Sequence, residues 1–147
     1  MIKGGSKVTK GLSITMMIPA DTTYIVYTIE KIMDFLNTHA VLTEEVSFEI
    51  KVILNELIIN AVLHGNKEDK TKQVSIKVGI CTNQVYAIIE DEGEGLPSEK
   101  ESENTKEFEK ILCLSERGRG LTIIESLCDC IKRNEKGNKV VVLKKLN

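Results

Sequence analysis

The amino-acid sequence predicts an α+β domain, a two-layer sandwich in which helices cover one face of a mostly antiparallel, mixed β-sheet. Segments of alternating hydrophobicity occur singly or in pairs joined by short turns, which is typical of antiparallel strands. Two longer segments carry apolar residues at helical spacing and follow one another after the first strand. The chain has 147 residues, 41% of them apolar, which is enough for one domain with a core that needs no disulfide or metal.

The first predicted strand spans residues 12–18 and follows a basic, glycine-containing tail over residues 1–10 that we expect to be flexible. Apolar and polar residues alternate along the strand, and Pro19 ends it. Asp21 or Thr22 can cap the helix that follows. The buried stripe of this helix is expected to comprise Ile25, Ile29, Ile32 and Leu36.

A second helix is predicted to begin after Thr43, whose side chain can cap it. Glu44 and Glu45 suit the positive N-terminal end of this helix. We expect a left-handed residue at Gly65 to close it. Its buried side is expected to comprise Val46, Ile50, Ile53, Leu57 and Ala61.

Four further strands are predicted in two pairs, first over residues 74–80 and 85–89, and later over residues 130–134 and 139–145. Residues 97–117 between these pairs form a polar, acid-rich stretch, and a loop of this length in a compact domain is a functional lid or a disordered segment. A helix is then expected to begin at a pair of glycines, with Leu121, Ile124 and Leu127 on its apolar side.

Composition and charge argue against several classes of protein. The formal net charge is −2, with three Tyr, three Phe and no Trp, so we expect neither direct nucleic-acid binding nor attraction to an anionic membrane. The four cysteines and two histidines lack zinc-ligand spacing, and we expect reduced thiols. No stretch has the length and apolar character of a signal peptide or a membrane span. We therefore expect a cytoplasmic protein with no membrane partner.

The first motif is the run NELIINAVLHGN in the second predicted helix. Glu56 and Asn60 are four residues apart and project from the same face, and His64 continues that stripe. An amide oxygen suits Mg²⁺, and a carboxylate can take a proton from a nucleophile held beside it. The alternative is a polar stripe that faces solvent. Polar groups among so many apolar neighbours are costly unless satisfied, which favours a functional role.

The second motif is EDEGEGLP, at the end of a predicted strand. Asp91 can accept a hydrogen bond from the exocyclic amine of adenine, while Gly93 and Gly95 let the backbone turn and approach a ligand closely. An ordinary acidic turn is the alternative. A dinucleotide fingerprint is disfavoured because Pro97 and a polar loop stand where its helix would begin. The spacing of a calcium loop is also absent.

The third motif is ERGRGLTIIESLCD. Gly118 and Gly120 precede an apolar helix that Leu121 opens, and free backbone amides at a helix start bind anions. Arg117 and Arg119 add positive charge for phosphate oxygens, although a flexible hinge is the alternative interpretation. No Gly-Lys-Ser/Thr phosphate loop occurs, which excludes a P-loop enzyme. Together the three motifs predict a nucleotide site that handles phosphoryl groups.

In this order the motifs resemble those of the GHKL ATPases, the superfamily of gyrase, Hsp90, histidine kinases and MutL, which has the Bergerat ATP-binding fold. NELIINAVLHGN is similar to its asparagine box, DEGEG to its first glycine box and GRGLTIIESLCD to its second. A single domain over residues 1–147 further resembles the anti-sigma factor serine kinases. The resemblance covers roughly residues 12–145.

The resemblance implies a role for each residue of the three motifs. Glu56 would polarise the attacking hydroxyl, Asn60 would hold Mg²⁺ and Asp91 would bind adenine. Residues 97–117 would form the ATP lid. Gly93 and Gly95 would shape the adenine pocket, and the remaining nucleotide-binding residues would be Arg117, Gly118, Arg119, Gly120 and Leu121.

The resemblance also implies an activity and partners. An ATP-binding, Mg²⁺-dependent anti-sigma factor with serine kinase activity would phosphorylate a serine of an anti-anti-sigma protein. In its other state it would hold a sigma factor, and proteins of this kind are commonly homodimers. Two alternatives stay open: a nucleotide-dependent regulatory binding module without phosphotransfer, and a switch kinase of a stress-signalling complex.

Two features depart from the pattern of the resembled proteins. Asn138 and Lys139 stand where Gly-Thr often precedes the last strand, with the Thr near adenine. Glu92 and Glu94 add negative charge beside the first glycine box, where it would weaken phosphate binding. We therefore expect both glutamates to point to solvent.

Overall fold

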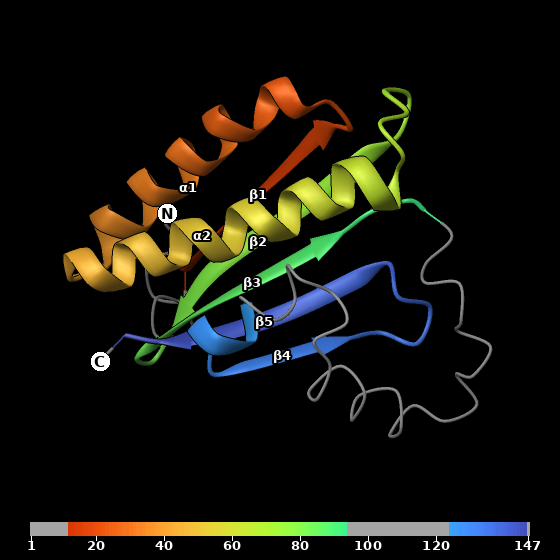
Figure 1. Ribbon diagram of the computed structural model, residues 1–147. Helices are drawn as coiled ribbons and strands as arrows, with labels where there is room; N and C mark the ends of the chain where they lie inside the picture. The colour runs from red at the N-terminus through yellow and green to blue at the C-terminus, as the bar shows by residue number, and fades with distance from the viewer. Residues whose placement is uncertain (1–11, 94–123, 147) are drawn as a thin grey trace.

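The structure, a computed structural model, describes residues 12–93 and 124–146, and within them two long helices lie on one face of a five-stranded sheet (Figure 1). The predicted tail over residues 1–10 and the predicted lid over residues 97–117 lie outside the described residues. The elements are β1 (Leu12–Pro19), the 3₁₀ turn η2 (Thr22–Tyr24), α1 (Ile25–His39), α2 (Glu44–Ile59), the π-helical turn η3 (Asn60–Gly65), β2 (Gln73–Cys81), β3 (Gln84–Glu90), β4 (Cys130–Arg133) and β5 (Lys139–Lys145).

The strand order is β1-β2-β3-β5-β4, and each pairing among these described strands is antiparallel. This arrangement confirms the predicted α+β sandwich with helices on one face. β5 lies between β3 and β4 and pairs with both, with Glu90 of β3 opposite Lys139 of β5. The residues that follow β3 and those that precede β5 therefore lie side by side at one end of the sheet.

Local capping interactions start both helical segments where the sequence predicts them. The Asp21 carboxylate accepts a hydrogen bond of 3.0 Å from the backbone N–H of Thr23, and the Thr43 hydroxyl accepts one of 3.0 Å from the N–H of Val46. Each bond satisfies a backbone donor that has no partner within the helix. The capping prediction is thus confirmed for Thr43, while Asp21 caps the 3₁₀ turn η2 that leads into α1, and α1 itself has no side-chain cap.

The predicted left-handed closure at Gly65 is wrong. α2 continues into η3, which ends at Gly65, and among the described glycines Gly137 alone has a positive φ, of 85°. Positive φ values occur instead at Lys67 and Glu68, in the loop that leads to β2. The glycine at position 65 must therefore be required for a reason other than backbone handedness.

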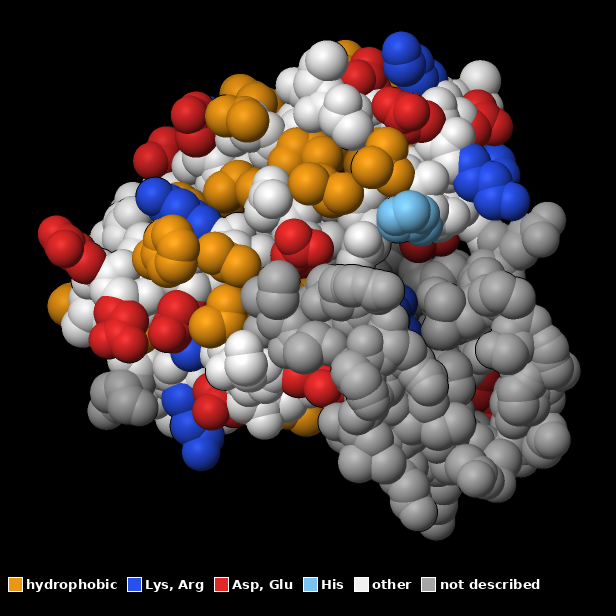
Figure 2. All heavy atoms as spheres, in the orientation of Figure 1, with side chains coloured by type: hydrophobic (Ala, Val, Ile, Leu, Met, Phe, Trp, Pro, Cys, Tyr) orange, Lys and Arg blue, Asp and Glu red, His pale blue; other side chains and the backbone are white. Residues whose placement is uncertain are grey.

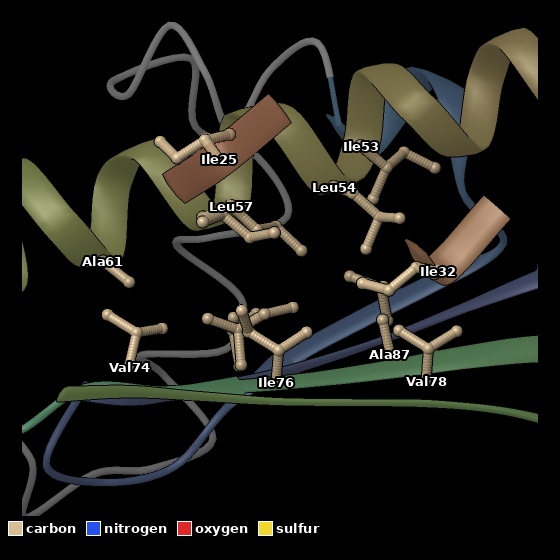
Figure 3. Close-up of a cluster of buried hydrophobic side chains, with 14 of the residues drawn as sticks. Ile25, Ile32, Ile53, Leu54, Leu57, Ala61, Val74, Ile76, Val78 and Ala87 are labelled. Carbon is tan, nitrogen blue, oxygen red and sulfur yellow. The ribbon is translucent and has the colours of Figure 1, made fainter. Parts of the chain in front are cut away.

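The hydrophobic core lies between the helices and the sheet (Figure 3). Apolar side chains of α1 and α2 point down onto those of β2 and β3, as their spacing predicts. Ile29 and Val46 are only partly buried, whereas Thr28 is fully buried and donates its hydroxyl to the carbonyl of Tyr24 at 2.7 Å. Within the described residues, no helix is both long enough and apolar enough to cross a membrane.

Candidate functional site

A π-helical turn ends the helix that carries the first motif. The backbone N–H of Asn60 donates to the carbonyls of both Glu56 and Leu57, and the N–H of Asn66 donates to the carbonyl of Ala61 at 2.9 Å. The last bond spans five residues, which is the π-helical pattern, and such turns are frequent at functional sites. The widened turn ends beside the residues that follow β3 and leads into the loop before β2 (Figure 1).

Two glycines bring this turn into contact with the second motif. A Cβ atom at Gly65 would overlap the carboxylate of Asp91, and a Cβ atom at Gly93 would overlap the carbonyl oxygen of Gly65. Only residues without a side chain fit at these two positions while Asp91 keeps its place. The requirement for glycine at position 65 is thus close approach to Asp91. The same contact makes the first and second motifs one structural unit.

The main chain of Asp91 is fixed by the residue that precedes β5. Its N–H donates to the carbonyl of Asn138 at 2.9 Å, and the side-chain amide of Asn138 donates to the carbonyl of Asp91 at 2.9 Å. The Asn138 amide oxygen accepts a further bond of 2.9 Å from Asn134. The asparagine that departs from the Gly-Thr pattern therefore anchors the backbone of Asp91.

The Asp91 carboxylate is half-buried and accepts one hydrogen bond, of 2.7 Å, from the backbone N–H of Gly93. Burial raises the pKa of Asp91, while the Gly93 bond and the charge of Arg133 act in the opposite direction. A carboxylate that has lost water without gaining enough partners is favourably placed to accept a hydrogen bond from a ligand. The amine group of a nucleobase is a donor of this kind.

Asn66 ties the loop after β3 to the start of β2. It is buried, its amide oxygen accepts a bond of 2.8 Å from the N–H of Glu92, and its amide nitrogen donates to the carbonyl of Gln73 at 3.0 Å. The Glu92 carboxylate in turn accepts a bond of 2.8 Å from the N–H of Gln73. Glu92 is exposed, as predicted, and its carboxylate is also held by the backbone, whereas Glu94 lies outside the described residues.

Glu56 and Asn60 are both half-buried in the helical segment that leads to Gly65. Their side chains form no hydrogen bond or ion pair with any residue that the structure describes. Asn60 precedes Gly65 by five residues, about 7.5 Å along a helix axis, so its amide lies at the same end of the domain as Asp91. His64, which continues the same stripe, is exposed. The roles of Glu56 and Asn60 stay predictions.

The remaining predicted site residues cannot be located. Gly95 and the whole second glycine box lie outside the described residues, namely Arg117, Gly118, Arg119, Gly120 and Leu121. The described part of the following helix begins at Ile124, which is fully buried in the core. The end of this helix is attached to the sheet, because the Lys144 amine donates to the carbonyl of Leu127 at 2.6 Å.

Sequence reasoning missed three residues that shape this end of the domain: Asn66, Arg133 and Asn138. Asn66 ends the first motif and had a visible signal, since it follows the glycine that contacts Asp91. Arg133 had a weaker signal, a charged residue two positions after Ile131 in an alternating strand. The contact of Asn138 with Asp91 had none, because it spans 47 residues and depends on the strand order.

Comparison with known proteins decides the family. The sequence profile of the histidine kinase-like ATPase domain matches residues 18–144, from the end of β1 into β5. The chain belongs to this ATPase family. Membership agrees with the resemblance inferred from the three motifs and with the helix-covered antiparallel sheet.

This ATPase domain is similar to curated bacterial proteins over most of its length. It is 31% identical over 102 residues to the anti-sigma F factor of Clostridium perfringens (strain 13 / Type A), which covers 67% of this chain and 72% of that protein. It is 35% identical over 105 residues to the anti-sigma F factor of Geobacillus stearothermophilus, 70% of each chain. It is 32% identical over 103 residues to the serine-protein kinase RsbW of Bacillus subtilis (strain 168), 67% of this chain and 64% of that protein.

Proposed function

We propose that the protein is an ATP-dependent protein serine kinase that also acts as an anti-sigma factor. It would phosphorylate a serine of an anti-anti-sigma protein and, in its other state, hold a sigma factor. The observation that carries the proposal is the contact of Gly65 and Gly93 with Asp91, in a member of an ATPase family whose curated relatives have these names. Binding to a sigma factor would place the protein in the cytoplasm.

The fit of ATP to the site rests on the surroundings of Asp91. The exocyclic amine of adenine would donate to the Asp91 carboxylate, whose other described hydrogen bond comes from Gly93. Because Gly93 and Gly95 have no side chains, their backbone atoms would lie directly against the base. The phosphates would be bound by the second glycine box, where Arg117 and Arg119 supply charge beside the free amides of Gly118, Gly120 and Leu121.

Asn60 is the residue that would hold Mg²⁺. Its amide oxygen is a hard ligand, and its side chain has no partner among the described residues. The described residues include no group of three His, Cys, Asp or Glu that could hold a metal, so the other ligands would be phosphate oxygens and water. When bound, Mg²⁺ neutralises charge on the transferring phosphates.

Glu56 is the residue that would act on the protein substrate. Its carboxylate accepts the proton of the serine hydroxyl, while the serine oxygen forms a bond to the γ-phosphorus. The bond between that phosphorus and the bridging β–γ oxygen breaks, and ADP leaves with the electron pair. Positioning and electrostatics supply most of the rate enhancement in phosphoryl transfer, so Glu56 must mainly orient the hydroxyl.

Two substitutions on α2 test these assignments. Glu56→Gln should abolish phosphoserine formation and change ATP affinity by less than about 2-fold, while Asn60→Ala should remove Mg²⁺-dependent ATP binding. The matched controls are Glu45→Gln and Asn55→Ala, which change exposed residues of the same helix. Calorimetric titration with ATP and transfer of labelled phosphate to an anti-anti-sigma protein are the two measurements. Unchanged transfer in Glu56→Gln would refute its role.

A regulatory binding module without phosphotransfer is a second candidate. Hydrophobic side chains gather on the outer surface of the helical layer (Figure 2), and exposed examples in these elements are Tyr24, Val26, Tyr27 and Phe48. A surface of this kind suits a protein partner whether or not phosphate is transferred. Incubation with labelled ATP and a partner separates the two candidates, because the module alone would give a stable complex without phosphoserine.

We also propose a homodimer. Tyr86, Ile88, Val141 and Leu143 share the sheet face opposite the helices, and no described helix covers that face (Figure 1). Burial of these residues against a second copy would remove apolar surface from water. Ile88→Lys should convert the dimer to a monomer in sedimentation equilibrium. Thr15→Lys, which changes an exposed residue on the same face of edge strand β1, should not.

A further inference from the structure

Arg133 lies at a position of β4 where the pairing with β5 predicts an apolar residue. It pairs with Val140 of β5, just as Ile131 pairs with Val142, and both valines are buried in the core. Directly opposed residues of antiparallel strands project from the same face of a sheet. The guanidinium of Arg133 therefore lies on the side of the sheet that the helices cover, at the end where Asp91 follows β3.

The charge of Arg133 has no complete set of partners. Its Nε atom is buried, and the N–H that it carries donates to no described residue. Burial lowers the pKa of Arg133, and the charge of Asp91 is the influence that raises it. No hydrogen bond or ion pair joins these two described residues. A buried N–H without an acceptor is costly, because it has lost water without gaining a partner.

Separate sets of hydrogen bonds hold the backbones of Asp91 and Arg133 in place. Asp91 is anchored through both its N–H and its carbonyl to Asn138, and its carboxylate is held by Gly93. Arg133 is followed by Asn134, whose side-chain oxygen accepts bonds of 2.8 Å from Gly137 and 3.1 Å from Lys139. An arginine and a carboxylate free to move would form a bidentate pair. Here both are fixed at their backbones.

The two groups together specify the chemistry of what would satisfy them. Asp91 offers an acceptor, and Arg133 offers a donor. A purine base carries both complements within one rigid ring system, an exocyclic amine and ring nitrogens that accept hydrogen bonds. A phosphate has no donor for Asp91, and an aliphatic group has neither. The nucleobase is therefore the part of a nucleotide that fits both residues.

We propose that Arg133 is a base-recognition residue, which donates a hydrogen bond to a ring nitrogen of the adenine whose amine is bonded by Asp91. The inference rests on the proposed ATP site and adds a residue to it from β4. The ring nitrogen would be the acceptor that no described residue provides for the Nε–H, or for the other N–H groups of the same guanidinium. Arg133 would thus set the selectivity of the site among purine nucleotides.

Binding of ATP analogues that each lack one ring nitrogen tests the proposal. Calorimetric titration would compare ATP with 1-deaza-ATP, 3-deaza-ATP and 7-deaza-ATP, on the natural protein and on Arg133→Met. The natural protein should bind one analogue about 10-fold more weakly than ATP, and Arg133→Met should bind ATP and that analogue with equal affinity. Lys132→Met, which changes the exposed neighbour on the opposite face, should keep the discrimination of the natural protein.

Each other outcome overturns the inference. If Arg133→Met weakens the binding of ATP and all three analogues by one common factor, or by none, Arg133 does not contact a ring nitrogen. If Arg133→Met fails to fold, Arg133→Lys serves, because it keeps the charge and loses the planar fork, and it should lose discrimination as well. If the natural protein does not bind ATP, the proposed function fails. If it binds ATP with no discrimination that depends on Arg133, this inference alone fails.

Discussion

The two ends of α2 contact the same sheet in different ways. At its first half, Ile50, Ile53 and Leu54 line a small apolar cavity with residues of β2, β3 and β5, and a single ion pair of 2.5 Å joins Glu49 to Lys144. At its other end, the turn that ends at Gly65 meets polar atoms of the loops after β3 and before β5. One end is held by hydrophobic packing, and the other by backbone contacts and buried amides.

This difference separates stability from function along one helix. At the apolar end, hydrophobic side chains are buried away from water, and their packing fixes the distance between α2 and the sheet. At the other end, backbone groups anchor Asn66 and Asn138, while Glu56, Asn60 and the Nε–H of Arg133 have no hydrogen-bond partner among the described residues. Proteins place such unsatisfied groups at binding sites and offset their cost elsewhere in the fold.

Gly65→Ala should have the largest effect at the Gly65 end of the helical segment. The added methyl group would overlap the Asp91 carboxylate, which must then move away from the position in which we propose that it accepts the adenine amine. We expect ATP affinity to fall by about 10- to 100-fold, equivalent to roughly 1–3 kcal/mol of overpacking strain. Calorimetric titration measures the loss.

The matched control for that substitution is Gly79→Ala on the opposite face of the sheet. Its Cβ atom would meet the ring of Tyr86 at 2.5 Å, and a side-chain ring can move where a fixed carboxylate cannot. ATP affinity should stay within about 2-fold of the natural value. Equal losses of affinity in the two variants would contradict a specific role for the contact between Gly65 and Asp91.

Lys144→Met should act mainly on the apolar end, where the lysine amine contacts both Glu49 and the carbonyl of Leu127. The substitution leaves the Glu49 carboxylate without its cation. The loss is costly because both side chains are mostly buried, with 15% of Lys144 and 19% of Glu49 exposed. We expect the free energy of unfolding to fall by about 2 kcal/mol, with ATP affinity unchanged. Urea unfolding and calorimetric titration measure the two quantities.

A double variant distinguishes a lost ion pair from lost packing. Glu49→Leu combined with Lys144→Met removes both charges and should recover the part of the lost stability that the unpaired Glu49 causes, while the bond to the carbonyl of Leu127 stays lost. Lys145→Met, which changes the exposed neighbour, should have little effect. If Lys144→Met weakened ATP binding as much as it weakened the fold, the two ends of α2 would not be independent.

The pH dependence of stability should distinguish Asp91 from Asp21. Burial raises the pKa of Asp91 in the folded state, so its ionisation opposes folding, and this cost develops as pH rises from the ordinary aspartate pKa through the raised one. Asp91→Asn removes the cost, so at neutral pH this variant should be at least as stable as the natural protein. The difference should vanish in acid, where both chains are neutral at this position.

Asp21→Asn is the control with the opposite sign. Hydrogen bonds from Thr23 lower the pKa of Asp21, so its ionised form stabilises the fold above the ordinary aspartate pKa, and this contribution is lost as pH falls through the lowered value. Asp21→Asn should therefore unfold more easily than the natural protein at neutral pH. Urea unfolding at neutral and acidic pH measures both variants, and a loss of stability in Asp91→Asn at neutral pH would contradict the assigned cost of its burial.

The sequence predicts the fold of this domain well because its signals are local. The caps at Asp21 and Thr43 act within three residues, and strand alternation and helical stripes are read from neighbouring positions. The prediction failed at Gly65, where a local rule for helix ends was applied to a glycine required by a contact 26 residues away. A glycine in a sequence can be required for its conformational freedom or for its small size, and the sequence alone does not show which of the two applies.

The site could be predicted only as far as its motifs are contiguous in sequence. Glu56, Asn60 and Asp91 stand out because polar residues interrupt apolar runs. The contributions of Asn138 and Arg133 depend on β5 lying between β3 and β4, and no local pattern specifies that order. Residues brought to a site by strand order alone require the structure to be recognised.

The interior position of β5 has a consequence for the order of events during synthesis. The strand that completes the sheet leaves the ribosome after α1, α2 and the other four strands, and the asparagine that anchors Asp91 leaves just before it. A nascent chain that stops before residue 138 exposes the open edge of β3 and lacks the anchor for the backbone of Asp91. If Asp91 binds the base as proposed, competence to bind nucleotide would then appear only after the last strand has joined the sheet.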